Sequence, residues 1–221
     1  MEKILKIGSR PSALALAQVD EIKALYPRVN FETHVFLTQG DKDKITSISE
    51  VDGSDFFTKE IDDALLRGEI DLAVHSSKDL PDILSEGLAV LLETESICPY
   101  DALVSKDKRK FAQLPSGLRI GTSSLRRKST VRLLRPDLRV IDIRGNIGER
   151  LALIGSRKID ALIVAFAALI RLGRKELISE VFPLEVFKTH PKQGSLSLMV
   201  RHDRWQEVKS ILSGQGQATG N

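Results

Sequence analysis

Cysteine, aromatic residues and histidine are all scarce in this chain of 221 residues. One cysteine cannot form an intrachain disulfide, and it leaves no cluster of thiolates to hold a metal ion. Aromatic residues make up only 5% of the sequence, so we do not expect stacking on nucleobases to be its main interaction. The four histidines lack the paired spacing of metal ligands. These absences predict a function without a metal.

Long hydrophobic runs are also missing. The longest one, residues 161–170, is about half the length that a helix needs to cross a bilayer. The first ten residues lack the apolar core of a signal peptide. The sequence therefore predicts a cytoplasmic protein without a membrane partner.

Charge is ordinary in amount but uneven in distribution. Apolar residues make up 42% and charged residues 29% of the chain, as in most globular proteins, and the net charge is +3. Residues 119–150 hold nine basic residues against three acidic ones, an excess of six, so the rest of the chain is net negative. Because the positive charge is concentrated in one stretch, we expect that stretch to meet an anionic partner.

Strand-like and helix-like patterns alternate along the chain. In the first half they predict strands at residues 3–8, 30–38, 70–74 and 87–93 and helices at 12–25 and 56–66. In the second half they predict strands at residues 101–105, 119–121, 139–144 and 161–165 and helices at 124–134, 147–154 and 167–172. The polar segment 39–53 is predicted to be a mobile loop. The alternation is typical of α/β proteins whose parallel sheets carry helices on both faces.

Breaks in this pattern around residues 96–100 and 183–191 predict two lobes. We expect a first lobe of residues 1–95 and 191–213 and a second lobe of 99–187. The last predicted segment thus returns to the first lobe. Residues 214–221 are mostly small and polar and are predicted to form a disordered tail.

Ligands of open parallel sheets bind beyond the carboxyl ends of the strands, and four segments of this chain place polar residues there. The first, residues 8–12, puts Arg10 between a strand and a helix, where it either reaches a ligand or is a solvated arginine of a turn. The second, residues 75–81, follows a strand that is predicted to be buried. Its Lys78 could hold a carboxylate, and its Asp79 could stabilise a developing cation or transfer a proton, unless the two form a structural turn.

The third segment, residues 121–128, joins a strand to a helix through small hydroxyl residues. These residues are Thr122, Ser123 and Ser124. Arg126, Arg127 and Lys128 then fall in the first helical turn, where positive charge opposes the helix dipole. A bound anion would remove that conflict, because a helix N-terminus offers free backbone N–H groups. The alternative is an exposed basic helix that tolerates the cost.

The fourth segment, residues 144–150, again leads from a strand into a helix, with Arg144 and Gly145 at the turn and Arg150 inside the helix. Arginine binds carboxylates through two parallel hydrogen bonds, which lysine does not match. The glycine spacing fits neither a dinucleotide motif nor a P-loop. The four segments together predict one cleft that binds a ligand with several carboxylates, with Asp79 as the single acid among the cations.

These segments resemble the porphobilinogen deaminase family, also called hydroxymethylbilane synthase. The matching stretches are residues 8–15, 74–81, 101–105, 121–127, 144–151 and 171–173. The resemblance runs in order from about Ile4 to Met199. It implies a fold of two doubly wound α/β lobes like type 2 periplasmic binding proteins, with a cleft between them.

The resemblance also implies a reaction of tetrapyrrole and heme biosynthesis. Four porphobilinogen units, each with an acetate and a propionate, are joined head to tail into hydroxymethylbilane with loss of ammonia. Asp79 would be the central catalyst of this transferase, with Lys78 as a second catalytic residue. Asp79 would stabilise a cationic azafulvene and the pyrrole N–H groups. The residues that would bind the acidic side chains or add hydrogen bonds are Arg10, Ser12, Lys78, Thr122, Ser123, Ser124, Arg126, Arg127, Arg144, Gly145, Arg150, Arg171 and Gln193.

The chain departs from the family pattern in the part that holds the primer, which is the dipyrromethane group from which the product chain grows. The family holds a dipyrromethane cofactor on a cysteine of a third, C-terminal domain, and this sequence is predicted to lack that domain. Cys98 matches no attachment motif and is expected to be a small, semi-buried residue. The glycine- and lysine-containing stretch of the family appears as residues 52–55 with reversed charge, and its G-Q-G motif appears as residues 192–194 without the first glycine.

Two interpretations stay open. The chain is either a shortened deaminase that holds its primer differently or a non-catalytic relative that binds a polycarboxylate tetrapyrrole precursor. A nucleic-acid binder would need basic residues over an outer face, whereas here they follow strand ends. Lys78 and Asp79 favour the enzyme, and we expect a monomer whose partner is the small-molecule substrate.

Overall fold

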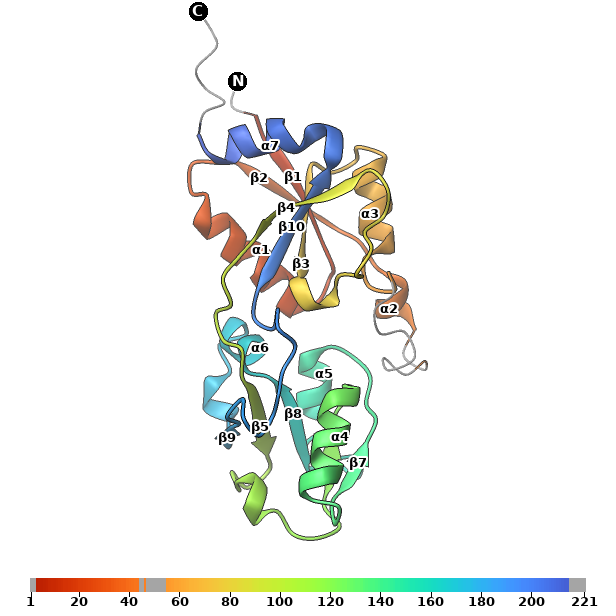
Figure 1. The fold of residues 1–221 in the computed structure, drawn as a ribbon, viewed down its shortest axis with the longest axis vertical. Coiled ribbons are helices and arrows are strands. Elements are labelled where there is room, and N and C mark those ends of the chain that lie inside the picture. Colours follow the sequence, from red (N-terminus) through yellow and green to blue (C-terminus); the bar gives the residue numbers. More distant parts are fainter. Residues whose placement is uncertain (1–2, 44–45, 47–54, 215–221) are drawn as a thin grey trace, which may run out of the picture. The chain divides into compact units, whose positions relative to one another are not determined.

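The computed structural model describes residues 3–43, 46 and 55–214. Its contacts divide the chain into two compact units, each built around a five-stranded sheet (Figure 1). The first unit includes the described residues up to Lys42, then Asp55–Glu95, and the chain from Ser195 onward. The second includes Asp43 and Ser96–Gly194.

The sheet of the first unit has the strand order β2-β1-β3-β10-β4. Its strands are β1 (Leu5–Ser9), β2 (Phe31–Val35), β3 (Leu72–Ser76), β4 (Leu88–Glu93) and β10 (Leu196–Arg201). Its helices are α1 (Ala13–Leu25), α2 (Gln39–Lys42), α3 (Lys59–Leu66) and α7 (Trp205–Leu212). Alternate strand residues enter two core clusters, one with Val19 of α1 and Val208 of α7 and the other with Ile61 and Leu65 of α3. The sheet is therefore covered on both faces.

The sheet of the second unit has the strand order β7-β6-β8-β5-β9. Its strands are β5 (Asp101–Ser105), β6 (Arg119–Gly121), β7 (Arg139–Ile141), β8 (Ala161–Ala165) and β9 (Glu180–Val181). Its helices are α4 (Leu125–Leu134), α5 (Ile147–Ala152) and α6 (Phe166–Arg171). Val131 of α4 packs in one core cluster, and Leu169 of α6 packs in another with partly buried Ile147 and Leu151 of α5. The predicted coverage of both sheet faces is thus found in both units.

Both sheets are mixed, so the prediction of parallel sheets is wrong in one strand of each. β10 runs antiparallel to β3 and β4, and β5 runs antiparallel to β8 and β9. Parallel neighbours need a connection that carries the chain back to the starting end of the sheet. β5 and β10 are the strands by which the chain enters a unit from the other one. They start at the edge where the other strands end, so they run in the opposite direction.

Several element boundaries differ from the predicted ones. The predicted loop 39–53 begins with helix α2, and its other residues lie largely outside the described part of the chain. Helix α3 begins at Lys59 rather than at residue 56, and β7 ends at Ile141 rather than at residue 144. β3 extends to Ser76, so His75 belongs to the strand and only Ser77–Asp79 form a short 3₁₀ turn.

The observed units and the predicted lobes share their overall order along the chain. The chain passes into the second unit after Glu95 and returns at Ser195, whereas the predicted second lobe spans 99–187. The predicted tail 214–221 lies, apart from Gly214, outside the described residues. No helix in the described part of the chain is long and apolar enough to cross a membrane.

Candidate carboxylate-binding sites

The predicted site residues of each unit lie at one edge of its sheet. In the first unit, Ser197 at the start of β10 pairs with His75 and Glu93, near the ends of β3 and β4. In the second unit, Asp101 at the start of β5 pairs with Ala165 at the end of β8. The carboxyl ends of the parallel strands therefore lie, in each unit, at the edge where the chain enters it. This is the edge at which open α/β sheets bind ligands.

A pocket at this edge of the first unit brings together two of the four predicted segments, residues 8–12 and 75–81. Arg10, Ser12 and Asp79 line it, together with Gln18 and His75. Its volume is about 60 Å³, enough for roughly four to six water molecules. The pocket thus has room for a group of carboxylate size.

The turn that carries Lys78 and Asp79 is fixed by β10. Ser77 is buried, its backbone N–H donates to the Ser195 carbonyl at 3.1 Å, and its hydroxyl is 2.8 Å from that of Ser197. Lys78 is half-buried and Asp79 is exposed. The buried serine therefore holds the turn while Asp79 faces solvent and the pocket.

His75 is a pocket residue that the sequence reasoning did not select. It is only 5% exposed, and burial, with the nearby charge of Arg10, lowers the pKa of its imidazole to about 4. The ring is therefore neutral at pH 7. Its Nε2 atom has no hydrogen-bond partner among the described residues. The signal in the sequence is its place three residues before the Lys-Asp pair, but only the fold shows that it is buried and lines the pocket with Arg10.

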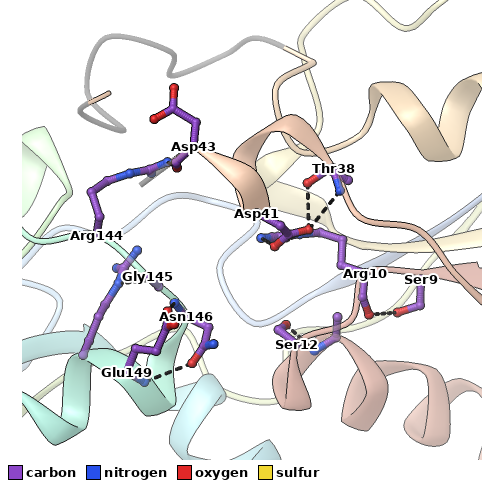
Figure 2. A network of polar contacts seen from close by, with 12 residues as sticks. Ser9, Arg10, Ser12, Thr38, Asp41, Asp43, Arg144, Gly145, Asn146 and Glu149 are labelled. Atoms are coloured by element: carbon purple, nitrogen blue, oxygen red, sulfur yellow. Dashed lines mark hydrogen bonds and ion pairs between the residues drawn. The ribbon is translucent and has the colours of Figure 1, made fainter. Parts of the chain in front are cut away.

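Arg10 already holds a carboxylate of its own chain. Its Nε donates to both carboxylate oxygens of Asp41 at 3.1 and 3.2 Å, and its Nη2 also contacts Asp41 (Figure 2). The guanidinium carbon lies 4.6 Å from the centre of the Phe57 ring. Burial acts to raise the pKa of Asp41, but hydrogen bonds and charge from Arg10 and hydrogen bonds from Thr38 lower it below its usual value.

Arg127 in the second unit forms a buried ion pair. Its Nε and Nη2 donate to the two oxygens of Asp101 at 2.8 and 2.7 Å, and Asp101 is only 2% exposed. Its Nη2 also donates to Oε1 of Gln193 at 3.3 Å. The sequence does not identify this partner of Arg127. Asp101 carries no local signal beyond its place as the first residue of a predicted strand.

The charge conflict at the start of α4 is resolved largely within the chain. Arg127 pairs with Asp101, and Lys128 Nζ lies 3.0 Å from Asp142. Arg126 is exposed, and its side chain has no ion pair or hydrogen bond with any residue that the structure describes. An external anion is therefore needed to explain only one of the three cations.

The hydroxyl residues before α4 differ in their availability. The Ser123 hydroxyl donates to the Ile143 carbonyl, and the Thr122 hydroxyl accepts from the Ser124 backbone N–H at 3.4 Å. Thr122 and Ser123 are buried, whereas Ser124 is half-buried and makes no side-chain capping bond to α4. Ser124 is therefore the hydroxyl best placed to accept a ligand contact.

The turn before α5 is held by a reciprocal cap. Glu149 N–H donates to the Asn146 side chain at 3.0 Å, and Asn146 N–H donates to the Glu149 carboxylate at 2.8 Å (Figure 2). Gly145 has a φ of +98°, which only glycine adopts at little cost. Arg150 Nε donates to its carbonyl at 2.7 Å, while Arg144 Nη2 donates to the Asp43 carbonyl at 2.6 Å.

Gln193 and Arg171 anchor the segment by which the chain leaves the second unit. The Gln193 amide donates to the Pro99 carbonyl and to Asp101 at 2.9 and 2.8 Å, and the residue is 2% exposed. Arg171 Nη2 donates to the Gly194 carbonyl at 2.8 Å. Both residues have structural contacts here, and their contact with a ligand stays a prediction.

Cys98 is unsuited to be an exposed nucleophile. It is 7% exposed, and burial raises the pKa of its thiol. A raised pKa lowers the thiolate population that would react. In the described part of the chain, no cluster of histidine, cysteine and acidic residues could hold a metal ion.

Comparison with known proteins shows which family the chain resembles over most of its length. A family model described as "Porphobilinogen deaminase, dipyromethane cofactor binding domain" matches residues 5–209. Porphobilinogen deaminase of Desulforamulus reducens is 39% identical over 218 residues, covering 97% of this chain and 70% of that protein. The same enzyme of Natranaerobius thermophilus is 43% identical over 214 residues, covering 95% of this chain and 68% of that protein.

Solved structures show a likeness of fold. A periplasmic substrate-binding protein of an ABC transporter from Coxiella burnetii has a TM-score of 0.56 at 12% identity, covering 97% of this chain and 92% of that one. The methionine-binding protein MetQ has a TM-score of 0.54 at 13% identity, covering 96% and 89%. The predicted likeness to periplasmic binding proteins is confirmed.

Proposed function

The chain belongs to the porphobilinogen deaminase family, and we propose on this basis that it condenses four porphobilinogen units into hydroxymethylbilane with release of ammonia. It would thus act as a transferase of tetrapyrrole and heme biosynthesis. The chain spans about 70% of the length of the curated relatives that it matches. The observation that carries the proposal is the match over residues 5–209, together with a pocket that places Asp79 with Arg10.

Substrate carboxylates would bind to the basic residues at the two sheet edges. In the first unit these are Arg10, with Ser12 as a hydrogen-bond donor, and Lys78. In the second unit Arg126 is the leading candidate because it is exposed and lacks a partner among the described residues. Ser124, Arg144 and Arg150 would add contacts beside it. A guanidinium group suits each acetate or propionate because it donates two parallel hydrogen bonds.

Asp79 would supply the catalytic charge. When the C–N bond of the aminomethyl group breaks, its electron pair leaves with ammonia and the pyrrole becomes cationic. A carboxylate close to that cation stabilises it, and it can accept hydrogen bonds from pyrrole N–H groups. The α-carbon of the next pyrrole then forms the new C–C bond and loses its proton. His75, which is neutral and lacks a partner at Nε2 in the described structure, would add a hydrogen bond without a second charge.

The family cofactor is dipyrromethane, and the side chains present fit its non-covalent binding better than its covalent attachment. When bound, it supplies the pyrrole carbon to which the first substrate unit is joined. Arg126 and Ser124 offer donors for its carboxylates. Cys98 is a poor attachment point because it is buried and its thiol has a raised pKa. The monomeric state and the cytoplasmic location stay predictions.

The proposal is tested by measuring porphobilinogen consumption together with the intact mass of the purified chain. Consumption with a mass increase of dipyrromethane size would support the family reaction with a covalent primer, and Cys98→Ala would then test the attachment point. Consumption without a mass increase would support a non-covalent primer. A chain that binds porphobilinogen or hydroxymethylbilane but consumes none would overturn the enzyme and support the alternative, a non-catalytic polycarboxylate-binding relative.

A further inference from the structure

The Arg10 guanidinium uses only one of its edges within the protein. Asp41 accepts hydrogen bonds from Nε and Nη2, which form the side edge of the planar group (Figure 2). A guanidinium has five N–H donors, so three are left over. One proton of Nη1 and one of Nη2 form the end edge of the group, and the second proton of Nη1 points toward Cδ. Nη1 has no partner among the residues that the structure describes. Since Arg10 lines the pocket with Asp79, this edge is available for a carboxylate there.

Asp41 is held in place by hydrogen bonds with Thr38 as well as by its contact with Arg10. The Thr38 backbone N–H and hydroxyl both donate to Asp41 Oδ2, at 3.2 and 2.8 Å, and Thr38 is fully buried. The Asp41 backbone N–H donates to the Thr38 carbonyl at 3.0 Å. The Asp41 side chain is 12% exposed. A carboxylate with these fixed contacts is a rigid support for the arginine.

The face of the guanidinium is also supported. Phe57 lies beneath it at 4.6 Å, and Phe57 lines the same pocket. Arg10 is therefore held by an acid at its side edge and by an aromatic ring at its face. An arginine that is ordered before binding loses less side-chain freedom when a ligand arrives.

We propose that Asp41 is a positioning residue, which orients Arg10 so that its free edge presents two parallel donors to a substrate carboxylate. The inference rests on the proposed function, in which Arg10 binds that carboxylate. The opposite role is competition, in which Asp41 would occupy the place of the ligand and would have to be displaced. The geometry favours positioning, because Asp41 takes the side edge and is anchored to buried Thr38, so the end edge is left for a ligand.

The two roles predict opposite changes in KM. Asp41→Ala and the nearly isosteric Asp41→Asn should each raise the KM for porphobilinogen, by roughly 10-fold for Asp41→Ala, with kcat within about threefold of wild type. Asp203→Asn is the matched control, because Arg201 Nε and Nη2 bind Asp203 in the same way, at 2.7 and 2.6 Å, on the exposed surface of the same unit. This control should keep the wild-type KM and kcat.

The measurement is steady-state kinetics of all four proteins, with the folded fraction of each determined by thermal unfolding. A loss of folded protein lowers the apparent kcat and leaves KM unchanged, so the rise in KM separates positioning from a merely structural role. An unchanged or lowered KM in both Asp41 variants overturns the inference while the proposed function stands. If the wild-type chain consumes no porphobilinogen, the proposed function fails and the inference fails with it.

Discussion

The two units share a sheet topology but differ in how they treat charge. Each has five strands, one of which runs against the others, and each collects polar residues at the edge where the chain enters. The first unit combines a single exposed acid, Asp79, with Arg10 and a neutral His75 in one pocket. The second unit has the larger excess of cations, but Arg127 and Lys128 have acidic partners of their own.

This contrast suggests a division of labour between the units. A carboxylate and a neutral imidazole can act on a cation that forms during the reaction, whereas exposed arginine can only attract and hold anions. We therefore expect substitution of Asp79 in the first unit to change the rate, and substitutions of the arginines that follow β6 in the second unit to change either stability or KM. The following substitutions test that division.

Asp79→Ala should have the largest effect, a loss of roughly 100- to 1,000-fold in kcat, because the developing positive charge loses its nearby carboxylate. The assay is porphobilinogen consumption, with circular dichroism to check the fold. Asp82→Ala removes another exposed acid three positions away and should leave the rate at the wild-type value. Near-normal turnover of Asp79→Ala would show that the first unit does not supply a catalytic carboxylate, and the proposed difference between the units would be wrong.

Arg127→Met should reduce the free energy of unfolding by about 3–5 kcal/mol, because it leaves the buried carboxylate of Asp101 without its cation. The measurement is urea denaturation at pH 7. Arg67→Met, which breaks an exposed pair with Glu69, is the control and should leave the free energy of unfolding nearly unchanged, because solvent screens exposed charges. Equal small losses in both variants would mean that Arg127 is not a structural residue, and would return it to the set of ligand contacts.

Asp62→Asn should stabilise the protein at pH 8 by about 2–3 kcal/mol and have little effect near pH 4. Asp62 is 3% exposed, and burial raises the pKa of its carboxyl to about 6; a hydrogen bond from Thr58 opposes this shift, and the charges of Asp55 and Asp63 add to it. A raised pKa means that the folded state binds the proton more tightly than the unfolded state. The stability that this proton contributes is present below about pH 4 and is lost as the pH rises through about 6.

The measurement for Asp62→Asn is the difference in urea midpoint between variant and wild type across this pH range. The difference cancels the titration of groups that both proteins share. A difference that does not change with pH would show that Asp62 has the same pKa in the folded and the unfolded protein, and would contradict the effect of burial.

Arg126→Gln should have the smallest effect of the four, a rise in KM of roughly 10-fold with little change in kcat, because it removes one carboxylate contact that is made in the ground state and the transition state alike. The control is Arg132→Gln on the same helix, which removes another exposed arginine and should leave KM unchanged. Equal changes in both variants would indicate a general effect of positive charge rather than a defined contact.

Local sequence patterns were sufficient to predict most of the helices and strands. The predicted strand 161–165 coincides with β8, the predicted helix 12–25 coincides with α1 and its cap Ser12, and the β/α alternation of both halves is present. These features depend on residues that are close in the sequence, where periodicity and caps are visible. The direction of β5 and β10 was missed, because it depends on which end of the sheet the chain enters and no local pattern records that.

For the candidate site, the sequence could predict where the motif around Asp79 lies but not which cations pair with acids of their own chain. The motif around Asp79 follows a strand end, so its place at the sheet edge could be expected from the sequence. The partner of Arg10 lies 31 positions away at Asp41, and the partner of Arg127 lies 26 positions away at Asp101. Such pairs form only when the chain folds, so residue spacing alone could not separate the cations that bind their own chain from those left for a ligand.

The sequence by itself determined the family and the α/β order, because contiguous motifs and local periodicity record both. Its expectation of Asp79 as the single acid among the cations was wrong, because Asp41, Asp101 and Asp142 pair with Arg10, Arg127 and Lys128. The tertiary structure decided which charges remain available. It buries His75 so that the ring is neutral, anchors Asp41 beside Arg10, and leaves Arg126 exposed while Arg127 is paired. Burial and long-range ion pairing set the charge that a ligand meets, and both depend on the packing of distant segments.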